Sequence, residues 1–162
     1  MSRNLSGTAI TAINSQETDK VFLTLLKLYD PATVPQFSPI YCVNDAYPVT
    51  SNSITYQPFP FKLRLPDDQV DGAIRQVQLQ IDNIDRSITQ VIRSTTNVPW
   101  VELRIIIAQT PNVVEVGPIN FSLRQVKYNK TNVQGTLVYE DLTQLRFPDL
   151  DYNPFDFPGL FL

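Results

Sequence analysis

The 162-residue chain contains no histidine, a single cysteine (Cys42) and only five glycines. Without histidine it lacks the commonest general base, the usual metal ligand and the side chain that titrates near neutral pH. A single cysteine excludes both an intrachain disulfide and a cluster of thiolate ligands. We expect Cys42 to be a small buried residue, because free cysteine is among the residue types most often buried.

Long apolar runs and clusters of basic residues are also missing. The longest apolar stretches, such as 21–26 and 105–108, are far shorter than the roughly 20 residues that cross a bilayer. With 13 basic and 16 acidic residues the net charge is −3, and no run of Lys or Arg offers a footprint for nucleic acid. Residues 1–5 lack the features of a secretory signal, so we expect the chain to be made and kept in a cytoplasm.

The composition is that of a folded domain, with 43% hydrophobic and 18% charged residues. A chain of this length suits one core, so we predict one β-rich domain over 20–146, an N-terminal arm over 1–19 and an extended C-terminal arm over 147–162. Residues 8–16 are compatible with a short helix or with an arm, and their pattern does not decide between the two.

Several segments have the pattern of β-strands. Residues 21–29 are β-branched and aromatic enough for an inner strand that ends at Asp30 and Pro31. Seven prolines between Pro31 and Pro66 exclude a long helix there, and 48–56 is expected to form a hairpin with an exposed tip. In 74–81, glutamines 76, 78 and 80 alternate with apolar residues, which indicates a half-buried strand with a polar outer face.

The second half of the chain is expected to be a β-meander with one helix before it. The apolar spacing of 84, 88, 91 and 92 predicts a flanking α-helix over about 83–94. A strand is predicted over 101–108, a turn over 110–112, and an extended piece over 113–116 that stops at Gly117 and Pro118. Residues 121–128 and 133–140 are predicted to pair as a hairpin. The fold class is therefore mainly β, either a β-sandwich or a partly closed barrel.

Candidate chemical sites are weak. Asp67, Asp68 and Asp71 could supply oxygen ligands to Ca²⁺, but their spacing fits poorly and an acidic surface turn is favoured. Asp82 with Asp85, or Glu140 with Asp141, could act as the acid and base pair of a glycoside hydrolase. Helix capping and turn formation are nevertheless sufficient reasons for these carboxylates to stand where they do. We therefore predict no enzyme activity, no catalytic residue, no metal and no cofactor.

The C-terminal residues are strongly apolar and interrupted by prolines. Left in water they would promote aggregation, so they should dock either on the chain's own core or on another chain. The second option is slightly favoured, which makes these side chains the candidate subunit interface. They are Phe155, Phe157, Pro158, Leu160 and Phe161.

Five segments together resemble the DUF1833 family of tailed-bacteriophage minor or distal tail proteins. They are VND at 43–45, LPDD at 65–68, VQLQIDNIDR at 77–86, VEVGP at 114–118 and FDFPGL at 155–160. The resemblance runs from about Leu23 to the C-terminus, and its most specific parts are IDNIDR at 81–86 and FPG at 157–159.

This resemblance implies a tail-tube-like fold and a structural role at the tail tip or baseplate. The expected protein is a distal tail ring, a homo-oligomer that is hexameric by analogy, and it connects the tail tube to a hub or fibres in the virion. Its partners would be the tail-tube, hub and tape-measure proteins, with DNA only in transit and no membrane. Two alternatives stay open, a host-surface saccharide-binding module that uses exposed loops such as 51–53, and a tail-associated hydrolase.

Overall fold

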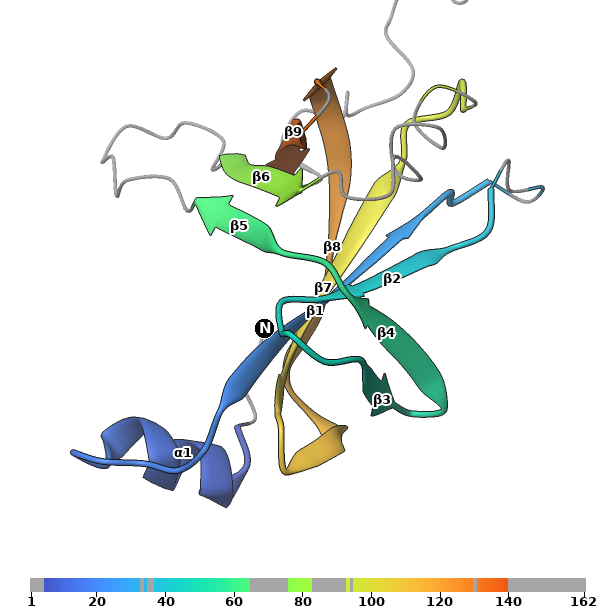
Figure 1. Ribbon diagram of the computed structural model, residues 1–162. Coiled ribbons are helices and arrows are strands. Elements are labelled where there is room, and N and C mark those ends of the chain that lie inside the picture. The colour runs from blue at the N-terminus through green and yellow to red at the C-terminus, as the bar shows by residue number, and fades with distance from the viewer. Residues whose placement is uncertain are drawn as a thin grey trace, which may run out of the picture.

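The computed structural model describes residues 5–32, 34, 37–64, 76–82, 93, 95–129 and 131–139 (Figure 1). This part of the chain is mainly β, as predicted, with one short helix before nine strands. The elements are α1 (Gly7–Asn14), β1 (Phe22–Tyr29), β2 (Ile40–Val43), β3 (Val49–Ser51), β4 (Ile54–Pro58), β5 (Phe61–Arg64), β6 (Gln76–Asp82), β7 (Trp100–Ile107), β8 (Thr110–Tyr128) and β9 (Asn132–Val138).

The nine strands form one sheet in the order β3-β4-β2-β1-β7-β8-β9-β6-β5. All neighbours are antiparallel except β2 and β4. The chain passes directly from β4 into β5, and this ribbon contacts both halves of the sheet (Figure 1). The backbone N–H of Phe59 donates to Val43 (3.1 Å), and that of Asp82 donates to the Pro60 carbonyl (3.0 Å). The sheet therefore curls towards a partly closed barrel.

Two apolar clusters fill the curved sheet. The larger one takes buried side chains from nearly every strand of the curl, including Leu26, Phe61, Leu79, Val101 and Leu137. The smaller one lies on the other face of β1, β2 and β7, where the β3–β4 hairpin covers it. Strands β1 and β7 have apolar residues on both faces because each face contributes to one cluster.

The predicted period-2 patterns are confirmed. Strand β1 lies between β2 and β7, so it is an inner strand. In β6, Val77, Leu79 and Ile81 are buried whereas Gln78 is exposed. The hairpins predicted over 48–56 and around 129–132 appear as β3–β4 and β8–β9.

Two predicted boundaries are wrong. The turn between β7 and β8 lies at Ala108 and Gln109 rather than at 110–112, and β8 begins at Thr110. The strand also continues through Gly117 and Pro118 instead of stopping there, because register shifts against β7 absorb the irregular backbone. Gly117 has φ +112° and the peptide bond to Pro118 is cis, so both residues sit in a bulged part of the strand.

The N-terminal segment contains a helix, which is one of the two options that its pattern left open. Helix α1 begins after Ser6, whose hydroxyl accepts a hydrogen bond from the Ala9 N–H at 3.1 Å. The Ser6 N–H and hydroxyl both donate to the buried carboxylate of Glu115 on β8, at 2.9 and 2.8 Å. Ala9 and Ala12 are buried, and the two Ser6 bonds fasten the start of α1 to the sheet.

Two other predicted segments lie outside the described residues. Of the flanking helix predicted over 83–94, the structure describes Arg93 alone, and the C-terminal arm over 147–162 is not described. No helix in the described part is long and apolar enough to cross a membrane.

Candidate functional site: a cationic sheet face

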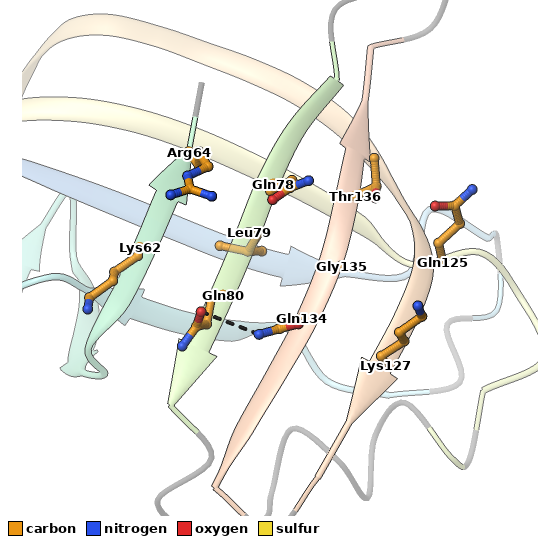
Figure 2. A pocket seen from close by; sticks show the side chains of 10 residues that line it. All are labelled: Lys62, Arg64, Gln78, Leu79, Gln80, Gln125, Lys127, Gln134, Gly135 and Thr136. Carbon is orange, nitrogen blue, oxygen red and sulfur yellow. Dashed lines mark hydrogen bonds between the residues drawn. The ribbon is translucent and has the colours of Figure 1, made fainter. Parts of the chain in front are cut away.

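The outer face of β5, β6, β9 and the end of β8 is polar throughout. Its composition follows from strand alternation, because apolar side chains of these strands turn inward to the larger cluster and their neighbours must turn outward. The outward residues are lysine, arginine, glutamine and threonine (Figure 2). No carboxylate is among the side chains that line the hollow in this face, and the exposed Asp82 lies beyond the hollow at the end of β6.

Strand register arranges these side chains in two rows across the sheet. The first row runs Lys62, Gln80, Gln134 and Lys127, and the second runs Arg64, Gln78, Thr136 and Arg124. Each row therefore has a cation at both ends and uncharged polar groups between them. Within the first row, the Gln134 amide donates to the Gln80 side-chain oxygen at 3.4 Å (Figure 2).

A bulge in β8 keeps both of its cations on this face. Arg124 pairs with Thr136 and Lys127 with Gln134, so β8 takes three steps where β9 takes two. Gln125 occupies the bulge with φ +52°. In a regular strand, Lys127 would point to the opposite face from Arg124, because the two residues are three positions apart. The extra residue in the bulge returns Lys127 to the face of Arg124.

The face is hollowed, with a volume of about 540 Å³. Leu79 and Gly135 form part of its floor. A Cβ on Gly135 would lie 2.5 Å from Leu123 Cδ1, so the missing side chain lets Leu123 pack beneath the sheet. The floor of the hollow therefore depends on Gly135 of β9, which lies between Leu79 of β6 and Leu123 of β8.

The charge of this face is unusual for a chain with a net charge of −3. Lys62, Arg64, Arg124 and Lys127 are exposed, and none of them makes an ion pair with another described residue. Guanidinium, ammonium and amide donors at the same surface bind carboxylates or other anions, and the amides add both donors and acceptors for a peptide backbone. The lining residues supply cationic and amide donors, which suit the binding of an anionic or peptide ligand.

Comparison with known families decides the relationship. A family model described as a domain of unknown function, DUF1833, matches residues 8–152. The chain belongs to the DUF1833 family. The match begins earlier than the resemblance at about Leu23 suggested, and it includes α1 except Gly7, whereas it ends before the FDFPGL segment. No curated protein matches the chain.

This DUF1833 chain has a second charged cluster, on the face of β1 and β7 that also carries the smaller apolar cluster. The Glu102 carboxylate is buried between Lys27, whose Nζ lies 3.6 Å from Oε2, and Arg104, which hydrogen-bonds Oε1. The Lys27 ammonium also lies 4.7 Å from the centre of the Tyr29 ring. Every charge in this cluster has a partner, which indicates a structural role beside the smaller apolar cluster.

Burial and the charges of this second cluster shift the pKa values of two tyrosines. Burial raises the pKa of Tyr29, and the Glu102 carboxylate raises it further. Burial also raises the pKa of Tyr56, where Arg104 acts in the lowering direction and Glu102 and Tyr41 in the raising one. The rings of Tyr41 and Tyr56 meet edge to face with centroids 5.4 Å apart. The raised pKa values keep the Tyr29 and Tyr56 hydroxyls protonated at neutral pH.

Of the acidic residues that the sequence offered as chemical candidates, Asp82 alone is among the described residues. Asp82 is exposed at the end of β6, whereas Asp85, 67–71 and 140–141 lie outside the described residues. In the described part, no group of three or more Cys, Asp or Glu side chains could hold a metal ion. The predicted interface side chains, Phe155, Phe157, Pro158, Leu160 and Phe161, also lie outside it.

The saccharide candidate loop at 51–53 is partly engaged. Asn52 and Ser53 are exposed at the hairpin tip, as predicted. Ser51 is buried and donates to the Pro111 carbonyl at 2.6 Å, and the Asn52 N–H donates to Asn112 Oδ1 at 2.8 Å. These bonds fasten the tip to the β7–β8 hairpin and leave only its outermost side chains for a ligand.

Sequence reasoning missed the cationic face as a unit. The glutamines of β6 were recognised as an outer face, but Lys62 and Arg64 alternate with Phe61 and Leu63 in the same way and were not connected to them. That alternation was the available signal. The inclusion of Lys127 depends on the β8 bulge, for which the sequence has no comparable signal.

Proposed function

We propose that this DUF1833 protein is a structural component of a phage tail tip or baseplate, a distal tail ring protein that connects the tail tube to a hub or fibres. The family resemblance motivates the tail location, and the mainly β fold suits a subunit that builds a tube or ring. The protein would act in the virion after synthesis in the cytoplasm of the host bacterium.

The observation that carries an assembly role is the combination of a cationic face with an unpaired strand edge. Strand β5 ends the sheet order, and within the described residues only β6 pairs with it. An open edge presents backbone donors and acceptors to another chain. A head-to-tail contact made through such a surface closes a ring when the rotation between subunits allows it.

The charge distribution constrains how such a ring would face DNA. Phosphates bind surfaces that carry several lysine and arginine side chains, which would retard DNA in transit. In a ring that DNA crosses, the face with Lys62, Arg64, Arg124 and Lys127 would therefore turn away from the channel. It would contact the neighbouring subunit or the tail-tube, hub or tape-measure proteins.

The C-terminal arm provides the first test. Native mass spectrometry should give closed rings, hexameric by analogy with other tail rings, for the full-length chain and monomers for a chain that ends at Pro148. The shorter chain lacks Phe155, Phe157, Pro158, Leu160 and Phe161. Both proteins should have the same circular dichroism spectrum, because the described domain ends before the deletion.

The tail location needs a separate measurement. Virions purified from a phage that carries this gene should contain the protein in a fixed ratio to the tail-tube protein, and antibody labelling should mark the tail tip. A full-length chain that stays monomeric at high concentration and is missing from virions would exclude the proposal.

A host-surface saccharide-binding module is the second candidate. The exposed tip of the β3–β4 hairpin is the observation in its favour, with Tyr47 76% exposed just before β3. Exposed aromatic rings and amides are common in saccharide sites. A glycan array probed with the purified protein tests this candidate, and binding that is lost in Tyr47→Ala but kept in Tyr139→Ala, an exposed tyrosine after β9, would favour it over the ring.

A further inference from the structure

Strand β5 has a two-sided pattern along its open edge. Phe61 is buried and Leu63 is half-buried on the inner side, where both contact the larger apolar cluster. Lys62 and Arg64 are exposed on the outer side. Residues two apart in a strand lie roughly 7 Å from each other, so the edge presents two cations at that spacing above two apolar side chains.

An added strand would need the complementary pattern. In a neighbouring strand, residues on the same face lie beside each other, so carboxylates two positions apart would meet the two cations. The residues between them would have to be apolar to continue the inner row. Strand addition of this kind uses backbone hydrogen bonds for affinity and alternate side chains for specificity.

The chain itself contains this pattern in residues 149–152. Asp149 and Asp151 are two positions apart, and Leu150 and Tyr152 alternate with them. Pro148 precedes them, and proline is acceptable at the first position of an edge strand. The spacing matches in either strand direction, because both the cations and the carboxylates are separated by two residues.

We propose that residues 149–152 of a second copy of this chain add as a strand to the open edge of β5. Asp149 and Asp151 then lie beside Lys62 and Arg64. Leu150 and Tyr152 extend the inner apolar row. This inference rests on the proposed function, in which copies of the chain assemble, and it specifies the contact that joins one copy to the next.

Charge reversal on both sides tests the contact. The double variant K62E/R64E and the double variant D149K/D151K should each self-associate roughly tenfold or more weakly than the wild type, as measured by sedimentation equilibrium. An equimolar mixture of the two should associate again, because each supplies the partner that the other lacks. The control is K20E/R93E, which makes the same charge change at two cations outside the cationic face and should associate like the wild type.

Four results would overturn the inference. Equal weakening by the control would mean that net charge, not the β5 edge, governs association. Failure of the mixture to associate would mean that the two variants do not share one contact. An unchanged association constant in K62E/R64E would exclude β5. A lower melting temperature of D149K/D151K with unchanged association would place the segment on its own chain.

A peptide measurement separates this inference from the proposed function. A labelled peptide of residues 147–154 should bind the chain ending at Pro148, and binding should weaken roughly tenfold for the peptide with D149N and D151N and at high salt. Peptide binding without rings of the full-length chain would keep the β5 contact while the ring proposal fails. Rings that form although the peptide does not bind would reject the β5 contact and leave the ring proposal standing.

Discussion

The ionisation of Cys42 should make the stability of the domain depend on pH in the alkaline range. Cys42 is 1% exposed in the larger apolar cluster, and burial raises the pKa of its thiol to about 12. A thiol in an unfolded chain has a pKa of about 8.5. Between these values the unfolded chain loses a proton that the folded chain keeps, so the contribution of Cys42 is complete below the lower pKa and is lost as pH rises towards the upper one.

The size of this effect follows from the two pKa values. Each pH unit between them lowers the free energy of unfolding by about 1.4 kcal/mol, which gives a loss of about 2 kcal/mol between pH 8 and 10. With a urea m-value of about 2 kcal/mol/M, the unfolding midpoint of the wild type should fall by about 1 M from this thiol alone. Urea titrations under reducing conditions at pH 8, 9 and 10 measure it.

The matched control is C42A. This variant leaves a small cavity and starts from a lower midpoint, but it has no thiol to ionise. Lysines and the tyrosines Tyr29 and Tyr56 titrate in both proteins, so their effect cancels in the difference between the two midpoints. The midpoint of the wild type should approach that of C42A as pH rises. Midpoints that fall in parallel from pH 8 to 10 would show that the thiol does not stay protonated in the folded protein.

Three further predictions concern the backbone and helix α1. G117A should lower the free energy of unfolding by about 3 kcal/mol or more, because its Cβ would meet a backbone oxygen of β7 at 2.7 Å and φ is +112°. G135A should lower the free energy of unfolding by about 1 kcal/mol, because its Cβ would meet a movable methyl group of Leu123. G7A should lower it less, because the space around Gly7 is open. Urea midpoints of the three glycine variants in any other order would refute this reasoning. E115Q should cost about 1 to 2 kcal/mol and speed amide exchange in α1, because it loses the charge that accepts both Ser6 bonds; unchanged exchange would show that these bonds do not hold the helix.

Local alternation made much of the fold predictable from the sequence. In β6, and in β8 and β9 around 129–132, apolar and polar residues alternate because one face is buried and the other is exposed. The inner position of β1 followed from its apolar residues on both faces. In each of these cases a short segment determines its own structure.

Non-local pairing could not be predicted in the same way. Nothing in residues 54–64 indicates that the ribbon of β4 and β5 joins β2 on one side and β6 on the other. Gly117 and Pro118 normally end a strand, and only the register against β7 shows why β8 continues. The cationic face depends on both kinds of information, since alternation selects which side chains turn outward and register decides which of them meet.

The charges of β5 would also determine the symmetry of any assembly that uses its edge. If two β5 edges paired with each other, Lys62 and Arg64 of one copy would face the same cations of the other, which is unfavourable. The edge is short and basic, two features that proteins use to discourage unwanted strand pairing. It can therefore accept an acidic strand but rejects its own copy, so the contact must join different surfaces of the two subunits. Contacts of that kind build rings or filaments rather than twofold dimers.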